Sequence, residues 1–301
     1  MLPIATAFDG VANSSSEAIA VQFEETQFWT YAQLQKASRQ IAQGLDAHVG
    51  PGQSVAVLLP RSPTQIAAII AILRLGAVYV PINMDLPQGR IEQLLAQLTD
   101  PLVLCLHGQK PPVLQDVNQA WLAVNSQEKS INVICNKIAS RDLQEIRREV
   151  HVEDVAAVLF TSGSTGLPKG VWLTHQNLLW PAQTVARQMQ ITPASRMLQF
   201  SQCSFDAHLI DILSTILYGG CLLQVSQDNV MSDLTGWIRR MNPNTAHFTP
   251  STILLLDPLR VPSIKRLVVS GEQVSRDLVD RWANRVHLVN LYGKEFTHPQ
   301  K

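Results

Sequence analysis

The segment Leu159-Phe160-Thr161-Ser162-Gly163-Ser164-Thr165-Gly166-Leu167-Pro168-Lys169-Gly170 decides how the rest of the chain is interpreted. It ends an apolar stretch, residues 155–160, that is typical of a buried strand, and open α/β sheets bind ligands at the carboxyl ends of their strands. Its glycines let backbone N–H groups converge on an anion, while its hydroxyls and one ammonium group offer further donors to phosphate oxygens. A plain polar turn is the alternative, and the density of donors favours a phosphate-binding loop.

The same segment differs from a Walker A loop, which runs from Gly-Lys-Ser/Thr directly into a helix. Here Pro168 precedes Lys169, and the apolar residues 171–173 continue as a strand. The pattern therefore points away from kinases and GTPases of the P-loop type.

Apolar strands and helices alternate on both sides of this loop. Expected strands are 54–59, 77–81, 102–106, 155–160, 170–173, 197–201, 221–225, 245–248, 265–269 and 286–291. Expected helices are 30–45, 63–75, 91–98, 176–188, 209–217, 234–241, 252–256 and 276–283. The order predicts an α/β fold in which parallel-rich sheets are flanked by helices. Residues 108–153 carry a weaker signal, typical of loops with minor elements.

Composition narrows the class of protein. The chain has 301 residues, 46% of them hydrophobic, with 24 basic and 24 acidic side chains, so no charge excess indicates nucleic acid or an anionic membrane as a partner. Four scattered cysteines without a CxxC pair give no support for zinc or disulfides and fit a reducing cytoplasm. No signal peptide is recognisable, and the longest apolar run, 66–73, is too short to span a bilayer. We expect a cytoplasmic protein.

The segment 159–170 resembles the signature of the adenylate-forming (AMP-binding) superfamily: acyl-CoA synthetases, luciferases and the adenylation domains of nonribosomal peptide synthetases. Trp29-Thr30-Tyr31-Ala32-Gln33-Leu34 resembles the first core motif of the synthetase domains. Residues 73–82 resemble the second, followed by Asn83 where that family usually has Asp. The resemblance implies the large N-terminal part of an adenylation domain over 1–293, without the small C-terminal domain.

The resemblance also implies which residues hold ATP. Its phosphates would lie against Thr161, Ser162, Gly163, Ser164, Thr165, Gly166 and Lys169. Its adenine would lie beside Ser270, Gly271, Glu272, Asn290, Tyr292 and Gly293. A solvated turn acid is the alternative interpretation of Glu272.

Asp206 lies in Ser204-Phe205-Asp206-Ala207-His208, which resembles the motif whose Asp receives the α-ammonium of an amino acid. Taken alone, Asp206 would be interpreted as a helix N-cap, and His208 as a tolerated helix residue. The implied substrate pocket consists of Asp206, Ala207, Ile210, Phe248, Val268, Ser270 and Leu291. Because its lining is mostly apolar, we expect an uncharged, aliphatic or moderate-sized amino acid. Ordinary core positions are the alternative for Ile210, Val268 and Leu291.

The resemblance ends at Gly293, where Lys294-Glu295-Phe296 replaces the family's Pro-Thr-Glu. Residues 294–301 therefore form an aberrant polar tail, and a truncation or a shifted reading frame is the hypothesis. A one-residue slip that would bring Glu295 to the metal is not favoured, so the metal ligands stay unknown. The family's catalytic Lys has no counterpart here, so no catalytic residue is assigned.

The implied function is the ATP-dependent activation of an amino acid as aminoacyl-AMP for nonribosomal peptide synthesis, incomplete or inactive in this isolated chain. It would use ATP and Mg²⁺, and would pass its product to phosphopantetheine on a separate peptidyl carrier domain among other synthetase modules. Nucleic acid and membrane are not expected partners. Two alternatives remain open: a fragment of an acyl-CoA or acyl-AMP ligase, and a non-catalytic ATP-binding remnant.

Overall fold

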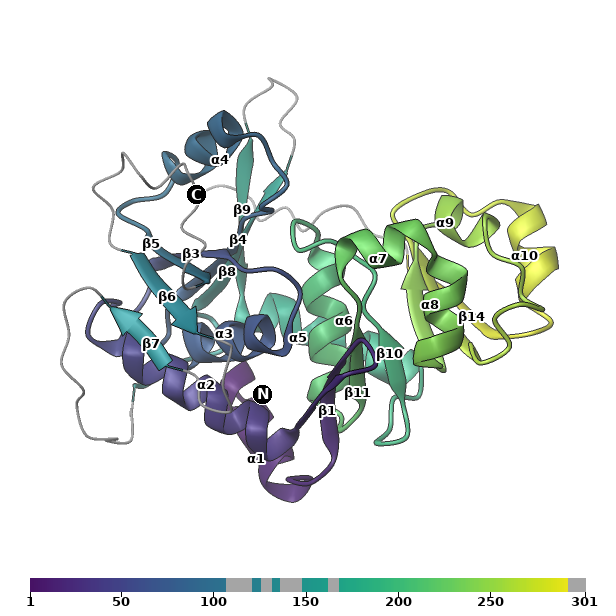
Figure 1. The fold of residues 1–301 in the computed structure, drawn as a ribbon, viewed down its shortest axis with the longest axis horizontal. Helices are drawn as coiled ribbons and strands as arrows, with labels where there is room; N and C mark the ends of the chain where they lie inside the picture. Colours follow the sequence, from purple (N-terminus) through teal and green to yellow (C-terminus); the bar gives the residue numbers. More distant parts are fainter. Residues whose placement is uncertain (107–120, 126–131, 136–147, 162–167, 292–301) are drawn as a thin grey trace. The chain divides into compact units, whose positions relative to one another are not determined.

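The computed structural model describes residues 1–106, 121–125, 132–135, 148–161 and 168–291, which form two compact units (Figure 1). The first unit takes Met1–Gly10 and Gln33–Asn177, and the second takes Val11–Ala32 and the described chain from Leu178 onward. Where the sequence led us to expect one partial domain over 1–293, the described chain forms two units, each with its own sheet. Residues 294–301 lie outside the described residues.

The sheet of the first unit has the strand order β7-β6-β5-β3-β4-β8-β9. Its strands are β3 (Ser54–Leu58), β4 (Val78–Pro81), β5 (Leu102–Leu106), β6 (Trp121–Asn125), β7 (Asn132–Cys135), β8 (Val155–Thr161) and β9 (Lys169–Thr174). The pairings are parallel except for β6 with β7 and β8 with β9. Helices α1 (Ile4–Ser14) and α2 (Tyr31–Asp46) lie partly in this unit, α3 (Pro63–Arg74) and α4 (Gln88–Leu95) lie wholly in it, and α5 (His175–Gln188) begins in it.

Helix α3 is a mostly apolar helix in the interior of the first unit. Ser62 caps its N-terminus by accepting a hydrogen bond from the N–H of Gln65, and Pro63 occupies the first turn, where no N–H is needed. Every residue from Pro63 to Leu73 is buried. A helix that is apolar on all sides belongs inside the protein. A second cluster joins strand residues such as Leu58 to α4.

The sheet of the second unit has the strand order β14-β13-β12-β10-β11-β1-β2. Its strands are β1 (Ile19–Phe23), β2 (Gln27–Thr30), β10 (Arg196–Leu198), β11 (Cys221–Gln224), β12 (Thr245–Phe248), β13 (Arg266–Ser270) and β14 (His287–Leu291). Only the β1–β2 pairing is antiparallel. Its further helices are α6 (Asp206–Ile216), α7 (Gln227–Ser232), α8 (Leu234–Met241), α9 (Pro250–Leu254) and α10 (Arg276–Trp282).

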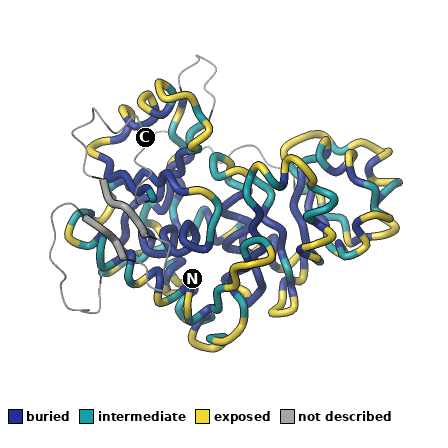
Figure 2. The backbone as a smooth tube through the Cα atoms, viewed as in Figure 1, coloured by how far each residue is buried: buried dark blue, intermediate teal, exposed yellow. Residues whose placement is uncertain are grey.

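The two faces of this second sheet differ in chemistry, and its central strands β11, β12 and β13 are buried on both faces (Figure 2). One face packs apolar residues such as Phe248 and Val269 against α8, α9 and α10, with Trp282 fully buried among them. Successive residues of a strand point to opposite faces. The alternate residues of the same strands therefore face the other way, and His247 meets α6 there.

The predicted α/β fold with parallel-rich sheets flanked by helices is confirmed. Helix α1, the β1–β2 hairpin and the short α7 were not predicted. Strand β1 pairs with β11, so that Val21 lies opposite Leu222. Local periodicity gives no sign of a partner so distant in sequence. Within 108–153, β6 and β7 are the described minor elements.

Candidate functional site

The predicted phosphate loop joins β8 to β9, which pair as an antiparallel hairpin. Thr161 ends β8 opposite Lys169, and its hydroxyl donates to the Lys169 carbonyl oxygen at 3.5 Å. The chain thus continues as a strand after the loop rather than as the helix of a Walker A site. Ser162, Gly163, Ser164, Thr165 and Gly166 lie outside the described residues.

Gly170 lets the base of this hairpin close tightly. A Cβ atom at Gly170 would lie 3.1 Å from Val158 Cγ1 and 3.5 Å from the ring of Phe160. A side chain there would crowd Val158, whose side chain would have to shift by a few tenths of an ångström. The neighbouring Lys169 is exposed, so its ammonium group is accessible to an anion.

Asp206 is the first residue of α6, and Phe205 occupies the N-cap position. Its Oδ1 accepts a hydrogen bond from the N–H of Ala207 at 2.8 Å. Asp206 is therefore an acid of the first turn and not the N-cap that the isolated sequence would favour. It is half-buried, as is Ala207, whereas Ile210 is buried. A half-buried carboxylate at this place can receive a cation from solvent.

Strand β12 turns Phe248 away from α6. Its ring packs edge-on against Phe200 with centroids 5.0 Å apart, inside the cluster that faces α8, α9 and α10. This placement disagrees with the pocket role predicted for Phe248, because the preceding residue, His247, is the one that faces α6. The prediction followed motif spacing, which did not resolve which of two adjacent strand residues faces the substrate.

The other predicted pocket residues lie on β13 and β14. Val268 is fully buried, whereas Ser270 and Leu291 are half-buried and stand opposite each other at the ends of the paired strands β13 and β14. Ser270 also lies within hydrogen-bonding distance of His247. These strand ends form part of the carboxyl edge at which ligands of parallel sheets bind.

A chain of hydrogen bonds runs from α6 through β12 to β13. Asp211 Oδ1 lies 2.7 Å from His247 Nδ1, and His247 Nε2 lies 2.7 Å from Ser270 Oγ. The side chains of Asp211 and His247 are 0% and 3% exposed. Burial lowers the pKa of His247, but the carboxylates of Asp211 and Asp206 outweigh it and hold the pKa above its ordinary value. The two carboxylates therefore favour the protonated imidazole.

Neither Asp211 nor His247 was among the predicted site residues. The available signal was an acid inside the apolar run Leu209-Ile210-Asp211-Ile212-Leu213. Ionised side chains are almost never fully buried unless they are paired. Such an acid predicts a buried partner, but only the tertiary structure identifies His247 as that partner.

A second buried polar chain lies beside the first. Gln199 Nε2 lies 2.6 Å from His208 Nδ1, and Gln224 Nε2 donates to Gln199 Oε1 at 2.7 Å. His208 is fully buried, so it is an internal hydrogen-bonding group rather than a merely tolerated helix residue.

The predicted adenine-side turn has a clear local cause. Gly271 has φ +84°, a left-handed conformation that favours glycine. The carboxylate of Glu272 accepts hydrogen bonds at 2.8 Å from both the N–H and the hydroxyl of Ser251, which ties the turn to α9. Asn290 is exposed on β14, while Tyr292, Gly293 and Glu295 lie outside the described residues.

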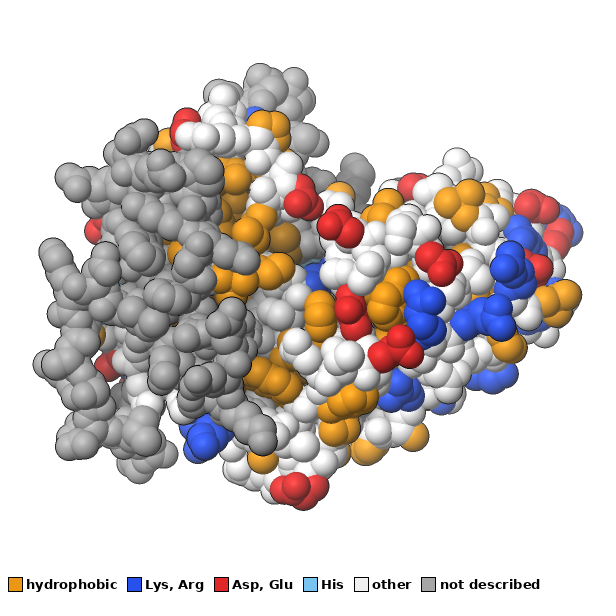
Figure 3. Space-filling model, in the orientation of Figure 1, with side chains coloured by type: hydrophobic (Ala, Val, Ile, Leu, Met, Phe, Trp, Pro, Cys, Tyr) orange, Lys and Arg blue, Asp and Glu red, His pale blue; other side chains and the backbone are white. Residues whose placement is uncertain are grey.

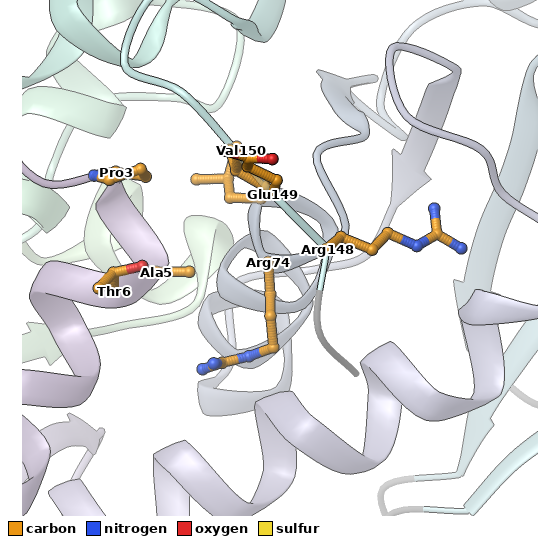
Figure 4. Close-up of a pocket in the computed structure, with 8 residues that line it drawn as sticks. Pro3, Ala5, Thr6, Arg74, Arg148, Glu149 and Val150 are labelled. Carbon is orange, nitrogen blue, oxygen red and sulfur yellow. The ribbon is translucent and has the colours of Figure 1, made fainter. Parts of the chain in front are cut away.

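A cavity of about 290 Å³ in the first unit does not coincide with any predicted site residue (Figure 4). It is lined by Pro3, Ala5, Thr6, Leu73, Arg74, Arg148, Glu149 and Val150. The Arg74 guanidinium pairs with Asp9, and that of Arg148 pairs with Asp46. Their charges are thus neutralised by neighbouring acids.

Charge and metal chemistry are sparse over the described part of the chain. Basic and acidic side chains are interspersed on the visible face of the second unit (Figure 3). In the same unit, Arg240 approaches both Glu25 and Asp233. No cluster of three His, Cys, Asp or Glu residues that could hold a metal ion occurs among the described residues. None of the described helices is long and apolar enough to cross a membrane.

Comparison with known proteins gives three consistent findings. The model of the AMP-binding enzyme family matches residues 8–294. The chain is 33% identical over 291 residues to the nonribosomal peptide synthetase sidE of Aspergillus fumigatus, covering 95% of this chain but only 13% of that synthetase. The chain thus spans a small part of the length of this curated relative.

Two solved structures share the fold at low identity. The N-terminal domain of FACL13 from Mycobacterium tuberculosis, solved with an inhibitor, is similar with a TM-score of 0.80 and 21% identity, over 98% of this chain and 76% of that one. NpsA-ThdA, an artificially fused adenylation-PCP di-domain from Klebsiella oxytoca, gives a TM-score of 0.78 and 21% identity, over 96% of this chain and 56% of that one.

Proposed function

Because the chain belongs to the AMP-binding enzyme family, we propose that it activates an amino acid with ATP. The substrate carboxylate attacks the α-phosphorus, a P–O bond to pyrophosphate breaks, and aminoacyl-AMP and pyrophosphate are formed. Asp206 is the observation that carries the proposal. It offers a half-buried carboxylate in the first turn of α6, where the α-ammonium of an amino acid would find its counter-charge.

Each unit holds groups with the chemistry that this reaction demands. In the first unit, Lys169 at the start of β9 is an exposed cation that fits a phosphate group. In the second unit, Asp206 is a carboxylate that fits an ammonium group. Positioning and charge neutralisation are the principal demands of such a displacement, so no protein nucleophile is required. Mg²⁺ would accompany the phosphates, and we assign no residue to it.

Nonribosomal peptide synthesis is the setting we propose for this activity. The similarity to sidE over 95% of this chain supports it, and the NpsA-ThdA fusion joins the same fold to a carrier domain. The acyl acceptor would then be the thiol of a phosphopantetheine arm on a peptidyl carrier domain. The balanced charge of the chain and its few, scattered cysteines favour a cytoplasmic location.

The experiment is ATP–pyrophosphate exchange with a panel of amino acids and matched fatty acids. The proposal predicts exchange with at least one amino acid, whereas an incomplete fragment, as the resemblance in the sequence implies, would give none. Asp206→Asn keeps the acceptor for the Ala207 N–H but removes the charge, so kcat/KM should fall about a hundredfold. Asp228→Asn is the matched control, because Asp228 is an exposed acid in the first turn of α7; its exchange rate should not change.

The other outcomes identify the alternatives. Exchange with fatty acids that is insensitive to Asp206→Asn would assign the chain to an acyl-CoA or acyl-AMP ligase. ATP binding without exchange for any acid would make the chain a non-catalytic ATP-binding protein. Either result overturns the proposal.

A further inference from the structure

The hydrogen-bond chain Asp211–His247–Ser270 in the second unit has a defined order of donors and acceptors. Both ring nitrogens of His247 are engaged, one by Asp211 and one by Ser270. An ionised carboxylate can only accept. His247 Nδ1 therefore carries a proton, and the role of Ser270 depends on the state of Nε2.

The state of Nε2 decides what the hydroxyl of Ser270 can offer to a ligand. If His247 is neutral, Nε2 is bare and accepts the hydroxyl proton, which leaves Ser270 only lone pairs for a ligand. If His247 is cationic, Nε2–H donates to Ser270 Oγ, and the hydroxyl proton is available to a ligand. The charge on a buried ring thus sets whether Ser270 is an acceptor or a donor.

The charges around His247 favour the cation. From α6, the carboxylates of Asp211 and Asp206 both act on it, and they raise its pKa against the opposing effect of burial. From β13 it meets the uncharged hydroxyl of Ser270. His208, on the same helix as the two acids, is engaged with Gln199 instead.

Ser270 lies where it can meet a substrate. It is the last residue of β13, it is half-buried, and it stands at the carboxyl edge of parallel strands. Through His247 and Asp211 it is linked to α6, whose first residue is Asp206. If Asp206 takes the α-ammonium, the side chain of the amino acid is the part of the substrate left to meet Ser270.

We propose that Asp211 and His247 are positioning residues that hold the Ser270 hydroxyl as a hydrogen-bond donor, so that the site selects an amino acid whose uncharged side chain carries an acceptor. This inference rests on the proposed function and makes it more specific. Two carboxylates, one imidazolium and the substrate ammonium sum to zero, so an ionised side chain would remain unbalanced. Amide and hydroxyl side chains fit, in place of the aliphatic class expected from the sequence.

The test measures binding of aminoacyl sulfamoyladenosines, which mimic the adenylate without reacting, in isosteric pairs: asparaginyl with leucyl, threonyl with valyl, and glutaminyl with methionyl. In at least one pair, we expect the wild-type chain to bind the polar member about tenfold more tightly. Ser270→Ala should bring that ratio close to one. Ser226→Ala is the matched control, because the Ser226 side chain makes no capping hydrogen bond, and it should keep the wild-type ratio.

A pH series separates positioning from mere packing. As pH rises through the elevated pKa of His247, the imidazole becomes neutral, Ser270 donates to it, and the preference for the polar member should fall. The double variant Asp211→Asn with His247→Gln has no titrating group in this chain of hydrogen bonds. The amide at position 211 donates to the amide at position 247, which in turn donates to Ser270 Oγ, so the Ser270 hydroxyl proton stays available to a ligand. It should keep the preference at every pH.

Three results would overturn the inference. The apolar member of every pair could bind as tightly as its polar isostere, or Ser270→Ala could leave the ratio unchanged. Tighter binding of the aspartyl than of the asparaginyl compound would contradict the charge balance. If instead no aminoacyl compound binds more tightly than its des-amino analogue, the proposed function itself fails, which is a different result from an apolar preference.

Discussion

The interiors of the two units differ in polarity. In the first unit, α3 is buried from Pro63 to Leu73 with mostly aliphatic side chains. In the second, α6 brings Asp211, Ser214 and Thr215 into the interior with His208, and the facing strands add His247 and Gln224. Apolar burial stabilises without direction, whereas buried polar groups stabilise only when each finds its partner. The second unit is therefore where recognition of a substrate side chain can be built.

The largest expected effect is on the buried ion pair of the second unit. Asp211→Ala leaves the His247 cation without its carboxylate, and should lower the free energy of unfolding by about 3–5 kcal/mol. Urea unfolding measures this. The double variant Asp211→Leu with His247→Met should recover most of the loss, because apolar pairs can replace buried ion pairs. A single variant within about 0.5 kcal/mol of wild type would remove the contrast between the two sheets.

A substitution in the apolar interior of the first unit provides the comparison for Asp211→Ala. Ile69 is 1% exposed in the middle of α3, so Ile69→Ala should cost about 3 kcal/mol from lost burial and the cavity that remains. Unlike the loss at Asp211, this loss should not change between pH 6 and pH 9. Urea denaturation at both pH values makes the comparison, and a strong pH dependence would contradict an apolar origin.

The one buried histidine described in the first unit, His175, should make stability depend on pH with the sign opposite to that of His247. His175 accepts a hydrogen bond from the Ile4 N–H at 3.3 Å, and burial lowers its pKa to about 4. Because the unfolded chain binds a proton near pH 6.5 while the folded chain does not, stability should fall as pH drops from 6.5 towards 4. The contribution is at most about 3 kcal/mol.

The variant His175→Gln isolates that contribution. Its unfolding free energy, measured between pH 7 and pH 4, should depend less on pH than that of the wild type. His247 should behave with the opposite sign, since its pKa is raised. Its stabilisation is complete below about pH 6.5 and is lost as pH rises through the folded-state value. Identical pH slopes for His175→Gln and wild type would contradict the assignment.

The smallest expected effect concerns Tyr31, which lies in the first core motif. Its buried hydroxyl lies 2.8 Å from the carbonyl oxygen of Gly220 and 3.1 Å from that of Ile216, the last residue of α6. Tyr31→Phe should cost about 1 kcal/mol, the usual value of one hydrogen bond. Thermal unfolding measures the change. A cost above about 3 kcal/mol would mean that this motif supports more of the second unit than its hydrogen bonds explain.

The sequence was sufficient for those parts of the molecule that local pattern determines. Alternating strands and helices predicted the α/β class, and the strand after Lys169 distinguished the phosphate loop from a Walker A site. Pairings distant in sequence, such as Val21 with Leu222, left no local sign. The same limit explains Phe248 and His247: strand alternation separates the two, but only the packing of α6 shows which one faces the acids.

The central claim is that Asp206 binds the α-ammonium of an amino acid, and one measurement tests it most directly. Isothermal titration compares an aminoacyl sulfamoyladenosine with its des-amino analogue, in the wild-type chain and in Asp206→Asn. We expect the wild type to prefer the amino compound about a hundredfold and the variant to bind the two about equally. Equal binding of both compounds by the wild type, or an undiminished preference in Asp206→Asn, would contradict the account.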